Sequence, residues 1–330
     1  MAPVTSTHDT FTIATGDGTQ LHVNRWLPDG DPKAVVQIAH GMAEHSERYD
    51  RFARRLGDAG YAVYASDHRG HGRTARSDRD KGYFADRDGF DTVVADLGLV
   101  GDHAREENPG VPFFLFGHSM GSFISRGYAI AHGDRLDGLV LSGTAGDPGL
   151  LGKVGGILAA TQARLRGRRH VSGLMDSLTF GQYNKAFKPA RTRFDWLSRD
   201  EAEVDRYIAD PDSGNVFTAG FFADLLPALA RINSDAEVGR IPKDLPIYLV
   251  SGSLDPVGDN SKGVERVAGQ LTRLGVRDVK VRFWPDGRHE VLNETNRDEV
   301  MDDFVRWFDE HLDTGAAADV EKGKPAPSQG

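Results

Sequence analysis

The chain contains no cysteine among its 330 residues. It can therefore form neither a disulfide framework nor a thiolate nucleophile nor a thiolate metal site. A chain of this length can bury a large core without such cross-links, so the absence carries no stability penalty. Because cysteine-free chains need no oxidising environment, we expect a cytoplasmic protein.

Long apolar runs and an excess of basic charge are also missing. No stretch approaches the roughly 18 uninterrupted apolar residues of a transmembrane helix. Residues 1–9 have neither the basic nor the apolar region of a signal peptide. The formal net charge is −9, whereas a general nucleic-acid binder is expected to show a basic footprint. Any membrane contact would therefore be peripheral.

Short apolar runs typical of strands alternate with longer segments typical of helices. The predicted strands are residues 10–14, 21–26, 34–40, 61–66, 113–116, 138–142, 247–251 and 279–284. The predicted helices are residues 49–59, 91–107, 119–132, 260–274 and 299–312. Near-continuous apolar strands must be covered on both faces. The pattern therefore predicts an α/β protein with a mostly parallel, eight-stranded sheet between two helical layers.

The alternation stops after residue 143 and resumes at residue 244, with helical segments but no convincing strand between. We predict one α/β core made of residues 9–143 and 244–313. It is interrupted by a helical insertion, residues 144–243, which we call the cap. Residues 314–330 are small, charged and rich in Pro and Ser, and are predicted to form a disordered tail.

The sharpest chemical signal is the pentapeptide Gly117-His118-Ser119-Met120-Gly121. It follows the strand 113–116 directly and opens the helix 119–132, which is the context of a nucleophile elbow. Such a turn strains the backbone of the serine and brings the neighbouring chain very close, so glycine is needed on both sides. We predict that Ser119 is a catalytic nucleophile.

A serine hydroxyl attacks well only when a base accepts its proton. Among 12 histidines, His289 lies in the loop between the last strand and the last helix, where it can reach Ser119. His40, His68 and His71 follow earlier strands and are expected to be structural or to shape the pocket. His118 is expected to turn its side chain away from the catalytic groups.

The base needs a carboxylate on its second ring nitrogen. Asp255 follows the strand 247–251, and Pro256 holds it in an extended conformation. The chain order Ser119, Asp255, His289 is the one expected after an elbow of this kind. Asp259 and Asp286 remain as alternatives.

A developing oxyanion needs hydrogen-bond donors aimed at it. One donor is expected to be the backbone N–H of Met120, next to the nucleophile. The second is expected to be the N–H of Met42, which a tight turn at Gly41 would present.

Four blocks of the sequence resemble the monoacylglycerol lipase and lysophospholipase family of α/β hydrolases. They are residues 40–49 (HGMAEHSERY), 67–72 (DHRGHG), 117–121 (GHSMG) and 252–256 (GSLDP), the last leading to His289. The resemblance implies the triad and oxyanion hole named above. It also implies that Glu44 and Arg48 form a structural pair bracing the oxyanion loop. The cap is longer than in the founding lipases, so no head-group preference is implied.

The leading hypothesis is a carboxylic-ester hydrolase that acts on monoacylglycerols, lysophospholipids or similar single-chain esters through an acyl-enzyme on Ser119. This chemistry requires no metal or organic cofactor. An aminopeptidase, for which acids in residues 195–243 could hold an ammonium group, and a thioesterase are the alternatives. A ligand-binding homologue without activity is disfavoured because all three triad residues are present. An epoxide hydrolase is disfavoured because its nucleophile would be a carboxylate.

The cap has apolar clusters and an uneven charge. The clusters could line an acyl channel or form the cap's own core; they are Leu150, Leu151, Val154, Ile157, Leu158, Leu174, Leu178, Phe217, Phe221, Phe222, Leu225 and Leu226. Residues 151–194 hold nine Lys and Arg against one acid, Asp176, a formal +8. This segment could dock on an anionic membrane, or it could pair with residues 195–243, where ten acids face five basic residues.

Overall fold

The computed structural model describes residues 6–312, and within them one eight-stranded sheet runs through the molecule. The strands are β1 (Thr7–Ala14), β2 (Gln20–Leu27), β3 (Ala34–Ala39), β4 (Tyr61–Ser66), β5 (Phe113–His118), β6 (Gly138–Ser142), β7 (Ile247–Gly252) and β8 (Val279–Trp284). Their order is β1-β2-β4-β3-β5-β6-β7-β8. Only the pairs β1/β2 and β2/β4 are antiparallel. The predicted fold class is confirmed.

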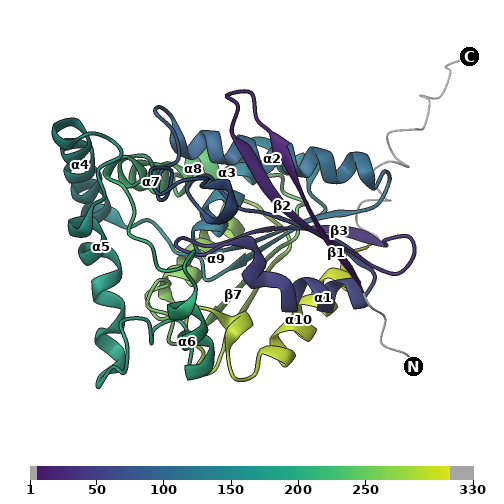
Figure 1. Ribbon diagram of the computed structural model, residues 1–330. Coiled ribbons are helices and arrows are strands. Elements are labelled where there is room, and N and C mark those ends of the chain that lie inside the picture. Colours follow the sequence, from purple (N-terminus) through teal and green to yellow (C-terminus); the bar gives the residue numbers. More distant parts are fainter. Residues whose placement is uncertain (1–5, 313–330) are drawn as a thin grey trace, which may run out of the picture.

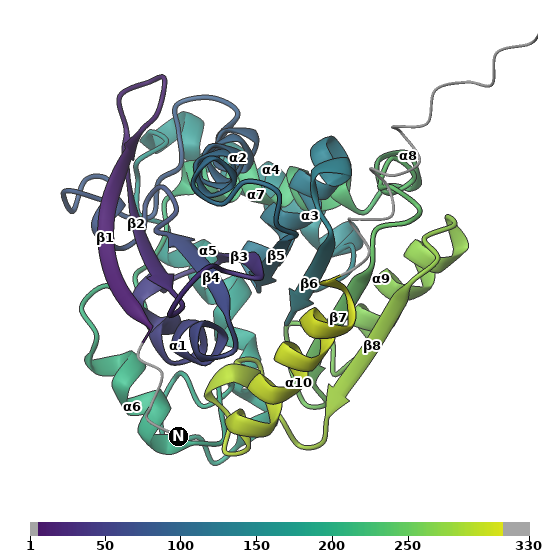
Figure 2. The ribbon, with the colours of Figure 1, turned by 90° about the vertical axis from the view of Figure 1, so that its right-hand side faces the viewer.

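Helices cover both faces of this sheet (Figure 2). On one face lie α1 (Asp50–Asp58) and α10 (Arg297–Glu310); on the other lie α2 (Gly89–Glu107), α3 (Met120–His132) and α9 (Lys262–Arg273). Strand β5 shows why both layers are needed. Phe114 and Phe116 belong to the core under α1 and α10, and Phe113 and Leu115 to the core on the opposite side. Because the side chains on both faces of this strand are apolar, each face must be covered by a layer of helices.

The cap is helical as expected. It contains α4 (Gly149–Arg166), α5 (Gly173–Thr179), α6 (Glu201–Ala209), α7 (Ala219–Ile232), α8 (Asp235–Val238) and the 3₁₀ segment η4 (Phe180–Phe187). Residues 149–238 contain no strand, although Val171 and Thr218 form an isolated bridge. Helix α7 packs on α2 and α3, and α4 packs on α7. In Figure 1, α4 and α5 therefore form the outer edge of the molecule, far from β1. The tail predicted for residues 314–330 lies outside the described residues.

Shorter 3₁₀ segments connect the core elements. They are η1 (Ser46–Tyr49), η2 (Gly72–Thr74), η3 (Gly133–Arg135) and η5 (Val291–Asn293). No helix within residues 6–312 has the length and apolar character needed to cross a bilayer.

The apolar clusters of the cap divide in a way that the sequence did not indicate. Phe217, Phe221, Phe222 and Leu225 are buried in the main core. Leu150, Leu151, Val154, Ile157, Leu174 and Leu178 are instead 49–85% exposed. For the four of these residues on α4, the cause is the face that this helix buries, which consists of Gly152, Gly156, Ala159 and Ala163. Because these small residues allow α4 to approach α7 closely, its larger side chains point outward.

We predict opposite effects for two Gly→Ala substitutions in helices. A Cβ on Gly121, in the first turn of α3, would lie 2.0 Å from the carbonyl oxygen of Ala39 in β3. Gly121→Ala should therefore destabilise the fold by about 1–3 kcal/mol or more. Gly269, exposed in α9, has nothing within 4 Å of such a Cβ. Gly269→Ala should stabilise the protein by about 1 kcal/mol, because alanine is the better helix former. Urea unfolding of both variants checks this, and an equal effect would contradict it.

Candidate active site

Ser119 lies at the sharp turn between β5 and α3. Its φ is +51° and its ψ −119°, a left-handed conformation that is costly for a residue other than glycine. The turn is held by the N–H of Ser119, which donates to the carbonyl oxygen of Ser142 at 2.8 Å. A Cβ on Gly117 would lie 2.4 Å from Oγ of Ser125. The close approaches predicted for Gly117 and Gly121 are thus both present.

His289 and Asp255 form a buried pair at the ends of neighbouring strands. Nδ1 of His289 lies 2.9 and 3.0 Å from the two carboxylate oxygens of Asp255, and the two residues are 2% and 0% exposed. The carboxylate also accepts from Oγ of Ser251 and the N–H of Val257, both at 2.9 Å. These bonds fix its position behind the imidazole ring.

The two alternative acids lie elsewhere. Asp259 is more than half exposed and pairs with Arg266, and Asp286 is an exposed turn residue. Among the three acids considered from the sequence, the structure brings Asp255 to His289.

The end of β6 brings Ser119 and His289 to one place. Ser119 bonds to Ser142, as described, and a Cβ on the next residue, Gly143, would lie 2.9 Å from Cε1 of His289. His118, next to the serine, packs against His289 with ring centroids 4.7 Å apart. The expectation that His118 points away from the catalytic groups is therefore wrong: its ring fills the space that Gly143 leaves. Burial, then His289, lowers the pKa of His118 to about 4, so it stays neutral.

Electrostatics favour the protonated form of His289. Burial lowers the pKa of this imidazole, but the carboxylate of Asp255, followed by Glu290 and Glu44, raises it, and the net shift is upward. An imidazolium formed by accepting a proton would be stabilised here. The arrangement can therefore serve general base and then general acid catalysis.

The loop after β3 lies beside the serine. A Cβ on Gly41 would lie 3.2 Å from Cβ of Ser119, so Met42 and Met120 follow two residues that are in contact. Their N–H groups as oxyanion donors stay a prediction. The loop is held by the N–H of Gly41, which donates to Oε1 of Glu44 at 2.5 Å. Arg48 pairs with the same carboxylate, as the resemblance implied.

The cap reaches this loop and the histidine loop directly. The carbonyl of Ala43, whose φ is +60°, accepts from the hydroxyl of Tyr207 and the N–H of Gly214, both at 2.9 Å. The carbonyl of Trp196 accepts from the N–H of His289 at 3.3 Å. The Trp196 ring also packs on His289, with centroids 5.1 Å apart.

Sequence reasoning missed Trp196 and Glu290, which binds Arg48. Only the position of Glu290 next to His289 could have drawn attention to it.

The other loop histidines form a buried cluster. The rings of His68 and His71 lie 4.2 and 5.0 Å from the ring of His40, whose Nε2 accepts from the N–H of His68. Burial lowers the pKa of His68 to about 3 and of His71 to about 4. Neutral, packed rings agree with a structural role. Within residues 6–312 no group of three or more His, Asp or Glu side chains is placed to hold a metal ion.

Known proteins resemble this chain in sequence and fold. A family profile described as serine aminopeptidase, S33, matches residues 30–296. The monoacylglycerol lipase of Mycolicibacterium smegmatis is 31% identical, over 94% of this chain and 100% of that protein. The human monoglyceride lipase is also 31% identical, over 93% and 92%. A thermostable carboxyl esterase of Bacillus coagulans, solved with glycerol, superposes with a TM-score of 0.86 at 29% identity, covering 92% and 99%.

These matches cover the core and the cap alike, and they agree with the resemblance found from the four sequence blocks. Since more than two thirds of the chain aligns with relatives at 31% identity, the chain belongs to the monoacylglycerol lipase family of α/β hydrolases.

Proposed function

We propose that the protein hydrolyses single-chain acyl esters, of the monoacylglycerol or lysophospholipid type, through an acyl-enzyme on Ser119. The observation that carries the proposal is the buried His289–Asp255 pair beside a serine held at a left-handed turn. Relatives named as monoacylglycerol lipases support the substrate class.

The mechanism follows from the positions of these groups. His289 takes the proton of the Ser119 hydroxyl as Oγ attacks the ester carbon, and the N–H groups of Met42 and Met120 receive the oxyanion. The imidazolium then gives its proton to the leaving alcohol, which departs. Water attacks the acyl-enzyme with His289 again as base, and the fatty acid is released.

A specific observation disfavours the aminopeptidase alternative. A carboxylate that already accepts from protein cations is a weaker site for a substrate ammonium group than a carboxylate without such partners. Nine of the ten acids in residues 195–243 form ion pairs with Arg, Lys or His. They are Asp200, Glu201, Glu203, Asp205, Asp210, Asp212, Asp224, Asp235 and Glu237. The tenth, Asp195, accepts from the N–H groups of Arg191 and Thr192. A substrate ammonium group would have to compete with one of these interactions.

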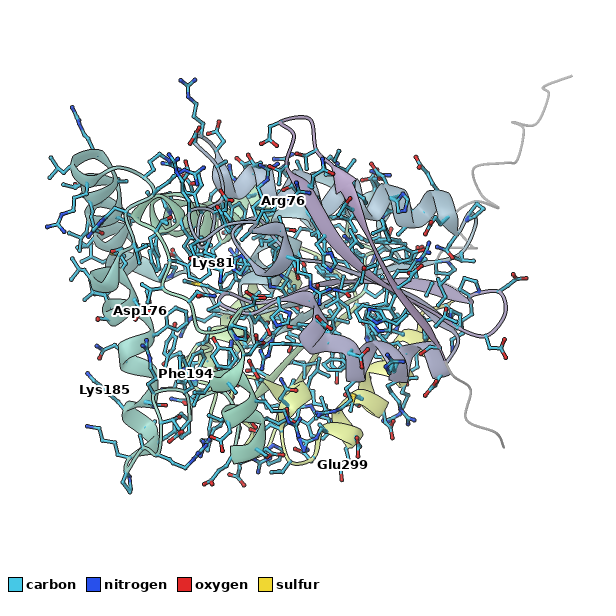
Figure 3. All side chains as sticks on the ribbon, in the orientation of Figure 1. Arg76, Lys81, Asp176, Lys185, Phe194 and Glu299 are labelled. Atoms are coloured by element: carbon cyan, nitrogen blue, oxygen red, sulfur yellow. The ribbon has the colours of Figure 1, made fainter. Side chains whose placement is uncertain are left out.

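The outer face of the cap is suited to a lipid surface. Leu150, Leu151, Val154, Ile157 and Leu165 on α4 are 55–85% exposed. Four of the nine cations in residues 151–194 pair with acids: Arg168, Arg169, Arg191 and Arg193. Within the described part of the chain, the other five form no ion pair: Lys153, Arg164, Arg166, Lys185 and Lys188. Figure 3 shows Lys185 at the outer edge of the cap. We propose that this face docks on anionic membrane that carries the substrate.

The substrate class is tested with p-nitrophenyl esters from C2 to C16, followed by monoacylglycerol and lysophosphatidylcholine. We expect the rate to peak at C8 or longer, because a lipid enzyme uses the acyl chain for binding. Ser119→Ala should lose about 10⁶-fold in kcat and should not react with a fluorophosphonate probe. Ser77→Ala, at an exposed loop serine, should behave as the wild type. A peak at C2–C4 would indicate a general esterase, faster thioester turnover a thioesterase, and faster amide turnover a peptidase.

The roles of the three acids are tested by pH dependence. The acidic limb of kcat/KM reports the pKa of His289 in the free enzyme, and because that pKa is raised, the limb should lie above the value of about 6.5 of an ordinary histidine. Asp255→Asn should lower kcat about 10⁴-fold and move the limb to lower pH. Asp259→Asn and Asp286→Asn should change neither, and a limb that moved with either one would refute the assignment.

Membrane docking is tested by sedimentation with phosphatidylcholine vesicles, with and without phosphatidylserine, at low salt. We expect tighter binding to the anionic vesicles. Replacing Arg164 and Arg166 by Gln should weaken that binding by about 2 kcal/mol, at about 1 kcal/mol per cation near the surface. Arg273, on α9, is a cation already paired with Asp235. Its replacement by Gln should have no such effect. Equal binding to neutral and anionic vesicles would end the electrostatic docking proposal.

A further inference from the structure

Glu290, the residue after His289, is a buried carboxylate that makes a two-pronged ion pair. It is 6% exposed. Nη1 and Nη2 of Arg48 lie 2.7 Å from its Oε1 and Oε2 respectively. This is the fork geometry in which guanidinium and carboxylate fix each other's orientation as well as their distance. Arg48 comes from η1, which is 242 residues away in the chain.

The same guanidinium continues the connection to the oxyanion loop. Nη1 of Arg48 also donates to Oε2 of Glu44. Oε1 of Glu44 accepts from the N–H of Gly41, the residue before Met42, and from the hydroxyl of Tyr49 at 2.8 Å. An unbroken series of hydrogen bonds therefore joins the backbone beside the base to the backbone beside the expected oxyanion donor.

The cluster also carries charge. Two carboxylates, Glu44 and Glu290, share one guanidinium, which leaves a net charge of −1 in a buried site. Burial opposes ionisation of Glu290, but Arg48 holds the pKa of its carboxyl well below the usual range. Both carboxylates act with Asp255 to raise the pKa of His289.

The groups that face this pair come from several elements. Around His289 they are Asp255 after β7, His118 on β5, and Glu290 and Glu44; around Glu290 they are Arg48, His118 and Asn293. The guanidinium carbon of Arg48 lies over the Tyr207 ring of α6, 4.8 Å from the ring centroid.

We propose that Glu290 is a positioning residue for ester hydrolysis. Through Arg48 it holds the loop of the base and the oxyanion loop in one fixed relation, and its charge stabilises the imidazolium of His289. This inference rests on the proposed function. It differs from a purely structural ion pair, because a purely structural pair would affect stability without changing the titration of the base.

The test is Glu290→Gln, which keeps the shape and removes the charge. The variant should fold, since Arg48 retains Glu44. We expect kcat for a p-nitrophenyl ester to fall about 10- to 100-fold, because misplacement of a reacting group by about 1 Å can cost about 100-fold. KM should change much less. The acidic limb of kcat/KM should move to lower pH, because one of the charges that raises the pKa of His289 is gone.

Two further variants keep the test decisive. Glu290→Asp retains the charge on a shorter side chain, so the limb should stay in place while kcat falls. Glu294→Gln removes a second buried carboxylate from the same segment, one that pairs with Arg199 of the cap. It should lower the thermal unfolding temperature but leave the limb in place.

The outcomes separate this inference from the proposed function. A wild type without esterase activity and without fluorophosphonate labelling would end both. An active wild type with unchanged kcat and limb in Glu290→Gln would end the inference alone. A limb that moved equally in Glu294→Gln would also end it, because the effect would then follow from any buried charge in this loop.

Discussion

The close approach of α3 to β3 is the constraint on which the rest of the site depends. Ser119 can keep a left-handed backbone only because Gly121 lets the first turn of α3 lie against the carbonyl of Ala39, and Gly117 lets the same turn fold back on itself. The strain at the serine is therefore balanced by packing of the whole β5–α3 unit. Because β3 also leads into the loop at Gly41, one contact sets the relation between the serine and the oxyanion loop.

The cap takes part in this arrangement and does more than cover it. Ala43, whose φ is positive, is held through its carbonyl by the cap residues Tyr207 and Gly214. The backbone N–H of His289 is held by the carbonyl of Trp196. Both loops that flank Ser119 are thus hydrogen-bonded to cap residues between 196 and 214. Movement of that part of the cap would alter the geometry of the reaction itself, whereas α4 and α5 contact neither loop through these bonds. The cap therefore consists of a half that completes the site and a half that faces outward.

The sequence predicted the features of the molecule that depend on local sequence patterns. Every observed strand end lies within three residues of the predicted one, because a strand buried on both faces is apolar along its whole length. The pairing of His289 with Asp255 was foreseen because the chemistry of a serine nucleophile requires it. Glu290 and Trp196 were not, since their partners lie 242 and 93 residues away. The exposure of α4 was missed because its contact with α7 is made by glycine and alanine.

The two halves of the cap differ in whether their charged side chains have partners. Acids in residues 195–243 are all engaged, several of them with core arginines such as Arg51 and Arg297, and so they hold this half of the cap to the core. The basic residues of α4 and η4 have no such partners among the described residues, and they flank exposed leucines. At an anionic lipid surface, exposed leucines can leave water while the cations beside them stay at the head groups. The half of the cap that is free of the catalytic loops is therefore the half that we propose to meet a membrane.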